Sequence, residues 1–355
     1  MGKSKKKGIR FWVKLLVVFV ILLIATSAIG VYHIYKTIYQ PNVSTQHLKG
    51  RYFYVHTGWN YNDVVNSLYE NGVIQNRNTF TWVAERKKYP QFVKPGRYKI
   101  KQGMSNNELI NLLRSGMQEP VKVTFNTVRT KNQLAGKVSK YIEADSLSII
   151  SLLNNAEFCS NYGFDRQKII TLFLPNTYEF YWNTSAEEFV ERMANEYKSF
   201  WNDERKQKAK KIGLTQSEVA TLASIVQAEQ TIHRSEWPRV AGLYINRLKQ
   251  GMLLQSDPTL IFAIGDFTIN RVLNKDKEIE SPYNTYKYIG LPPGPILLPE
   301  TKAIDAVLNY ETHDYLYMCA KEDLSGYHNF SKTLSQHNIY AQRYREALNK
   351  RGIMR

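Results

Sequence analysis

The chain has 355 residues, of which 43% are apolar and 13% aromatic, so two or three packed domains are expected and general disorder is excluded. The formal net charge of +17 predicts an anionic partner. The sequence has no CxxC or HExxH motif, so we expect neither a metal nor a cofactor. Its two cysteines, Cys159 and Cys319, suit either one disulfide outside the cytoplasm or two buried thiols.

Residues 1–14 form a basic arm, and residues 15–34 an apolar segment. Leu15 to Tyr32 is uncharged and, at roughly 18 residues, long enough to cross a bilayer. By the positive-inside rule the arm stays in the cytoplasm and the rest of the chain lies outside, anchored in the cytoplasmic (inner) membrane by one span. A cleaved signal peptide is the alternative, but the apolar run continues past Ala28 through Val31. A basic surface in this location matches lipid headgroups and wall polymers, and no nucleic acid is expected.

Residues 35–50 turn polar and predict a linker, and residues 51–118 contain a weak internal repeat. Each copy has a short alternating segment, a glycine, and a short run with helical apolar spacing that ends at a glycine, Gly72 or Gly116. The pattern predicts two strand–turn–helix units. It resembles LysM modules, which bind polymers containing N-acetylglucosamine. A small α+β spacer without a ligand remains the alternative.

Residues 119–355 read as a mixed, mainly helical α+β domain. Apolar residues at steps of four from Phe189 to Trp201 predict one helix over 186–212 that ends at Gly213. Near the C-terminus, 315–319 and 327–330 flank Gly326 and predict a β-hairpin.

A helix beginning after Thr215 is the best specified element of this domain. Thr215 and Glu218 have the spacing of a capping box, and apolar residues recur at spacings of three and four as far as Val226. Glu229 follows Val226 by three, so the same stripe carries a carboxylate in the last turn of the helix. We expect Glu229 to be the catalytic residue.

Lost hydration and the negative end of the helix dipole both raise the pKa of a carboxyl in that position. A raised pKa suits a general acid, which must hold a proton near neutral pH. The neighbouring Gln227, Gln230 and Thr231 are candidate neutral hydrogen-bond partners. The alternative is a solvated glutamate at a frayed helix end.

Two turn-rich segments, 254–259 and 281–286, have the polar and aromatic composition of loops that position ligands. We expect them to bind the substrate through Gln255, Ser256, Asp257, Tyr283, Asn284, Thr285 and Tyr286. Loop packing is the alternative role for each residue.

Four strings in the same order, FLPNTYEF, SIVQAEQ, AGLYINRLKQGMLLQSDPT and YNTYKYIGLPPGPI, resemble the MltG family, also called YceG-like endolytic murein transglycosylases. The resemblance implies cleavage of the β-1,4 bond between N-acetylmuramic acid and N-acetylglucosamine in peptidoglycan strands, with 1,6-anhydro ends. It also implies penicillin-binding synthases as partners and a role in ending glycan elongation. The family commonly has glutamate at both outer positions where this chain has Gln227, Ala228 and Glu229. The resemblance assigns catalysis to the second, Glu229.

Two other functions remain open from the sequence. A muramidase that hydrolyses the same bond would use Glu229 as its acid and Asp257 as its second carboxylate. A scaffold without catalytic activity would bind the wall through the LysM-like module alone. The lyase needs only one carboxyl, which first donates a proton and then accepts one.

Overall fold

The computed structural model describes residues 4–126, 128–269 and 272–352. Helices dominate it, and the described strands form three two-stranded sheets, so the predicted α+β class is confirmed. The chain divides into two compact units. Unit 1 comprises Met1–Val121 and Tyr181–Asn183, and unit 2 comprises Lys122–Phe180 and Thr184–Arg355.

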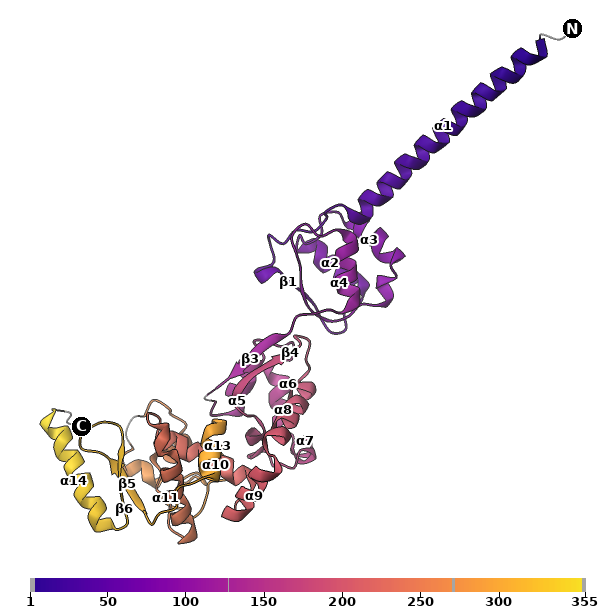
Figure 1. Cartoon of the computed structure of the whole chain (residues 1–355). Helices are drawn as coiled ribbons and strands as arrows, with labels where there is room; N and C mark the ends of the chain where they lie inside the picture. Colours follow the sequence, from indigo (N-terminus) through magenta and orange to yellow (C-terminus); the bar gives the residue numbers. More distant parts are fainter. Residues whose placement is uncertain (1–3, 127, 270–271, 353–355) are drawn as a thin grey trace. The chain divides into compact units, whose positions relative to one another are not determined.

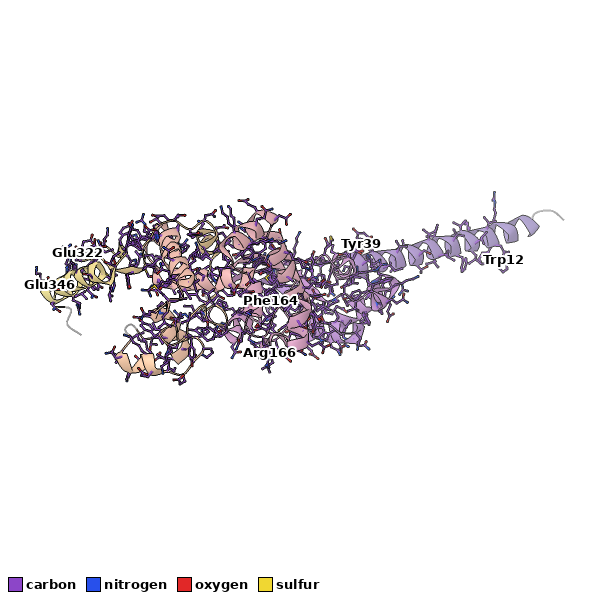
Figure 2. All side chains as sticks on the ribbon, turned by 90° about the horizontal axis from the view of Figure 1, so that it is seen from below. Trp12, Tyr39, Phe164, Arg166, Glu322 and Glu346 are labelled. Carbon is purple, nitrogen blue, oxygen red and sulfur yellow. The ribbon has the colours of Figure 1, made fainter. Side chains whose placement is uncertain are left out.

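Helix α1, Ser4–Tyr39, contains the predicted membrane span. Its segment Arg10–Tyr39 is long and apolar enough to cross a membrane, and none of its most apolar window is buried. Its side chains project outward all around the helix, as Figure 2 shows between the labelled Trp12 and Tyr39. An apolar helix without protein packing is typical of a lipid-facing segment.

The segment after α1 differs from the linker predicted over 35–50. The helix continues to Tyr39, and the next residues pack into unit 1, where Val43 belongs to the core. Asn42 is buried because its amide finds partners, among them the Asn106 side-chain oxygen at 2.7 Å. Asn106 in turn donates to the Thr37 carbonyl at 2.9 Å. These hydrogen bonds satisfy the polar groups that the composition suggested would face water.

Both copies of the internal repeat have the predicted strand and helix. The elements of unit 1 after α1 are β1 Tyr52–Val55, α2 Tyr61–Glu70, α3 Arg77–Arg86, β2 Gly96–Lys99 and α4 Asn106–Ser115. The strands pair antiparallel, with Tyr52 opposite Lys99. Gly58 and Gly103 turn the chain in the two copies with φ of 84° and 77°, which favours glycine. Helix α3, between the copies, was not predicted.

Unit 2 is built around helix α10, Gln216–Glu229, which packs against α9, α11, α12 and α13 (Figure 1). Its elements are β3 Val121–Phe125, α5 Lys131–Val138, α6 Ser146–Asn154, α7 Ala156–Asn161, β4 Asn176–Phe180, α8 Ala186–Phe200, α9 Asp203–Ile212, α10, α11 Trp237–Lys249, α12 Asp257–Ile264, α13 Thr301–Leu308, β5 Tyr317–Ala320, β6 His328–Ser331 and α14 Leu334–Lys350. Strand β3 begins at the division between the units and pairs with β4.

The prediction of a single helix over 186–212 is wrong, because the first helix ends at Phe200 and a second begins at Asp203. The Trp201 side chain is buried, and Asn202 starts α9 by accepting a hydrogen bond from the Arg205 amide at 2.9 Å. Asparagine is a strong N-cap, so it ends one helix and begins another without a glycine. The predicted end at Gly213 is confirmed by its φ of 82°.

The predicted C-terminal hairpin is confirmed as β5 and β6, with Cys319 opposite Asn329. The cysteines are free thiols, Cys159 buried and Cys319 half-buried, so the disulfide alternative is wrong.

Two helical glycines of unit 2 give a matched test of packing. A Cβ on Gly242 in α11 would collide with the Glu311 carbonyl oxygen, whereas a Cβ on Gly136 in α5 meets nothing within 4 Å. We predict that Gly136→Ala stabilises the protein by about 0.5–1 kcal/mol and that Gly242→Ala destabilises it by about 1–3 kcal/mol. Thermal unfolding of the full chain in detergent measures both, and equal effects would contradict this packing of α11.

Candidate catalytic site

Glu229 is the last residue of α10, and the start of that helix is fixed by the predicted capping box. Glu218 accepts a hydrogen bond from the Thr215 amide at 2.7 Å, and Thr215 Oγ1 accepts one from the Glu218 amide at 3.3 Å. Every residue from Val219 to Val226 is buried, so α10 is enclosed on all sides. Such a helix has one register, and Glu229 is therefore held at a defined place where it keeps partial exposure.

The next residue, Gln230, locks the end of α10. Its side chain donates to Glu236 Oε2 at 2.6 Å and to the Gly326 carbonyl at 3.0 Å. Its own carbonyl accepts a hydrogen bond from Trp237 Nε1 at 2.7 Å. His328 completes the cluster, with Nδ1 2.9 Å from Glu236 Oε2. The frayed helix end considered from the sequence is therefore wrong.

One oxygen of Glu229 receives two hydrogen bonds. Tyr244 Oη donates to Oε1 at 2.8 Å, and Ser256 Oγ donates to the same atom at 2.5 Å. In the part of the chain that the structure describes, no side chain donates to Oε2. A proton on the carboxyl therefore belongs on Oε2, because Oε1 is occupied as a double acceptor.

Burial raises the pKa of Glu229 above its ordinary value, and the nearby negative charge of Asp257 raises it further. The hydrogen bonds from Ser256 and Tyr244 act in the opposite direction, as does His328, because they favour the carboxylate. Burial is the largest effect, so the net pKa is raised. Such a carboxyl can release its proton to a strong acceptor and stabilise the anion that remains.

Ser256 gives up one structural role for this hydrogen bond. It occupies the N-cap position of α12, yet its hydroxyl makes no capping hydrogen bond and reaches Glu229 instead. A serine N-cap typically contributes about 1 kcal/mol to a helix. Helix α12 therefore lacks the stabilisation of a capped start, and Glu229 gains a hydrogen-bond donor.

The segments 254–259 and 281–286 lie side by side, as predicted, and are tied together through Thr285. Its carbonyl accepts from the Gln255 amide at 3.0 Å, and its hydroxyl accepts from the Ser256 amide at 3.0 Å. Thr259 Oγ1 lies 2.8 Å from the same hydroxyl. Gln255, Thr259 and Thr285 thus form a rigid support around Ser256.

Burial separates the predicted binding residues into two groups. Asn284 and Thr285 are buried, and Asn284 donates to the carbonyls of Lys277 and Ile279 at 2.9 Å each. These two side chains position the loop. Their place beneath the surface favours the loop-packing alternative.

Ser256 is buried as well, whereas the remaining four candidates reach the surface of the site. Asp257 is exposed and accepts a hydrogen bond from Tyr286 Oη at 2.6 Å. Gln255 is exposed and has φ of 53°, a strained value for a residue with a side chain. Strained backbone is common at functional sites. Tyr283 lines a separate cavity of about 410 Å³.

Sequence reasoning missed Tyr244 and assigned the wrong partners to Glu229. Gln227 accepts from the Glu300 amide at 2.7 Å, and Gln230 belongs to the cluster described above. The sequence patterns assign Tyr244 no role at the site. Its hydroxyl could have predicted its role as a partner of Glu229, because a tyrosine on a buried helix face needs a hydrogen-bond partner. Among the described residues, acidic, histidine and cysteine side chains do not gather in groups of three that would hold a metal ion.

Comparisons with known proteins agree with this architecture. The family described as "YceG-like family" matches residues 53–343. The endolytic murein transglycosylase of Bacillus subtilis strain 168 is 29% identical over 304 residues, which cover 81% of this chain and 83% of that protein. The endolytic murein transglycosylase of Streptococcus pneumoniae R6 is 27% identical over 298 residues, which cover 74% of this chain and 53% of its own length. The 2.6 Å crystal structure of the yceG-like protein lmo1499 from Listeria monocytogenes aligns with a TM-score of 0.55 and 25% identity, over 82% of this chain and 99% of that one.

The raised pKa of Glu229 makes a prediction about stability. The folded protein holds this proton more tightly than the unfolded chain, so the resulting stabilisation is present below the ordinary pKa near 4.5 and is lost as the pH rises through the native pKa. Glu229→Gln has no proton to lose at this position, so its stability does not fall in this pH range. We therefore predict that the Tm of the variant rises relative to wild type as the pH increases above 4.5, by about 2–4 °C for each kcal/mol relieved.

Glu204→Gln is the control, because the Lys208 ammonium lowers the pKa of the exposed Glu204 carboxyl. For that variant the relative Tm should fall, and not rise, with increasing pH. Parallel pH trends in the two variants would contradict the assigned pKa direction of Glu229.

Proposed function

The chain belongs to the YceG-like family, and from this premise we propose that it cleaves peptidoglycan strands internally as a lytic transglycosylase. The bond cleaved is the β-1,4 bond between N-acetylmuramic acid and N-acetylglucosamine. We assign the reaction to unit 2, which contains Glu229. The observation that carries the assignment is a largely buried carboxyl that receives hydrogen bonds from two hydroxyls on Oε1 and, among the described side chains, none on Oε2.

In the first half of the reaction Glu229 acts as an acid. The proton on Oε2 passes to the glycosidic oxygen as the bond from muramic acid C1 to that oxygen breaks. The carboxyl becomes an anion, and the hydroxyls of Tyr244 and Ser256 stabilise its charge through Oε1. The same donors therefore matter most after the proton has left.

In the second half the carboxylate acts as a base. It removes the proton from the muramic acid C6 hydroxyl, and the C6 oxygen forms a bond to C1. A 1,6-anhydro ring results, the proton returns to Oε2, and no water is consumed. One carboxyl is sufficient for both halves.

The position of Asp257 makes a muramidase, which hydrolyses the same bond, the second candidate function. Its charge is close enough to raise the pKa of Glu229, and two carboxyls beside one glycosidic bond are the equipment of a hydrolase. Its hydrogen bond from Tyr286 supports a positioning role in the proposed lyase. The products separate the two functions.

Helix α1 supports the proposed location of the enzyme. We propose that it crosses the cytoplasmic membrane once, with the basic arm inside and the chain after α1 outside, because lysines and an arginine precede the apolar segment. New glycan strands are made at the outer face of this membrane. Penicillin-binding synthases are accordingly the proposed partners, and cleavage of their products ends glycan elongation.

The proposed reaction predicts which ends the products carry and how cleavage depends on Glu229. Wild-type protein should release fragments with anhydro ends, lighter by one water than reducing ends. Glu229→Gln should reduce cleavage to near background, since each lost acid or base role costs on the order of 10² to 10⁴ in rate. Mass spectrometry of digested peptidoglycan measures both effects, with Glu204→Gln as a control. Reducing ends that vanish in Asp257→Asn would establish the muramidase instead.

The second prediction concerns topology. Protease added to spheroplasts should digest the chain after α1 and leave a protected fragment that contains the basic arm and the apolar part of α1. A full-length chain that resists protease until the cells are lysed would contradict the proposed orientation. So would a mature chain that lacks about the first thirty residues.

A further inference from the structure

Two adjoining cavities form a groove in unit 2 beside the acid. Their volumes are about 330 and 410 Å³, and Arg129 and Phe262 line both. The first cavity also reaches Ala228 and Pro258, the chain neighbours of Glu229 and Asp257. The combined space, called the basic groove below, therefore begins next to the two carboxyls of the site.

The groove carries an excess of positive charge. Four basic side chains and one acidic side chain line it, namely Arg129, Lys131, Arg166, Arg234 and Glu300. Glu300 pairs with Arg234 at 2.9 Å. In the described ranges of the chain, the other three basic groups have no carboxylate within ion-pair distance.

The neighbours of Lys131 and Arg166 leave these two groups without a carboxylate. Lys131 donates to the backbone carbonyls of Leu153 and Arg166 at 3.0 and 3.1 Å. Asp165, the residue before the exposed Arg166 labelled in Figure 2, pairs with Lys168 at 3.2 Å. The groove therefore keeps an excess of positive charge, which favours an anionic ligand.

Aromatic rings make the groove rigid. The rings of Phe262 and Tyr283 lie 4.7 Å apart, and the Arg129 guanidinium lies 4.3 Å from the centre of the Phe267 ring. Stacking restrains a guanidinium while leaving its N–H groups free for a carboxylate. A Cβ on Gly294 would lie 3.3 Å from the Tyr283 hydroxyl, so glycine allows the backbone to approach this tyrosine closely.

We propose that the basic groove binds the acidic peptide that muramic acid carries. This proposal rests on the proposed function. In a peptide-bearing strand the sugars are uncharged, because the lactyl carboxyl of muramic acid is in amide linkage, whereas the peptide bears free carboxylates. Charge complementarity next to the cleavage site therefore selects the peptide, and the arginines form bidentate contacts with its carboxylates.

Binding of a small probe to the full chain in detergent tests the subsite. The probes are N-acetylmuramyl-L-alanyl-D-glutamate and its diamide, and calorimetry uses the Glu229→Gln protein. We expect the diacid to bind at least about tenfold more tightly than the diamide, since hydrogen bonds to charged groups are the stronger kind. Arg129→Gln and Arg166→Gln should each remove about that factor for the diacid alone.

Arg345→Gln, an exposed arginine of α14, is the matched control and should change neither affinity. Arg166 is exposed, so its variant keeps the test available if Arg129→Gln fails to fold. Equal affinities for diacid and diamide would overturn the proposal. An effect of Arg345→Gln as large as that of Arg166→Gln would overturn it as well.

Cleavage then separates this proposal from the proposed function. Wild type should cleave peptide-bearing strands with a higher kcat/KM than strands stripped by an amidase, and Arg166→Gln should abolish that difference while Arg345→Gln preserves it. Equal cleavage of both strands by wild type would reject the subsite and keep the lyase. Arginine-dependent binding of the diacid without cleavage of either strand would reject the lyase and keep the subsite.

Discussion

The site depends on how the end of helix α10 is held. A carboxyl in this position loses hydration, which raises its pKa, and the two hydroxyl donors on Oε1 limit that effect. The same arrangement favours the proton before the reaction and the anion after it. Because both donors use one oxygen, the other is left to exchange a proton with the substrate.

The surrounding fold keeps this balance fixed. Gln230 joins the end of α10 to the start of α11 and to the hairpin turn, so three separate parts of unit 2 meet one residue after the acid. Thr285 joins the loop before α12 to the loop after it. Ser256 supports the acid and not its own helix. The start of α12 is less stable than a capped helix would be, and in return the position of the Glu229 carboxyl is fixed; such local costs are common at functional sites.

Local patterns in the sequence predicted the elements that local chemistry determines. The capping box, the buried stripe of α10, the hairpin and the strand–turn–helix repeat all follow from neighbouring residues. The burial of Asn42 depends on a partner distant in the chain, which spacing does not reveal. The break at Asn202 comes from a local N-cap to the Arg205 amide, which the apolar spacing of the surrounding residues does not indicate. The composition of the two loops was enough to predict a binding site. The pairing of Tyr244 with Glu229 joins two different helices, so local sequence patterns do not predict it.

The ionisation of Glu229 tests the account most directly. Difference infrared spectroscopy, wild type minus Glu229→Gln, resolves the C=O band of this one protonated carboxyl as the pH is raised. The account predicts that the band persists above 4.5, the ordinary value for glutamate, and that Tyr244→Phe moves its disappearance to still higher pH, since that hydroxyl favours the carboxylate. A band that disappears at or below 4.5 in wild type would contradict the account.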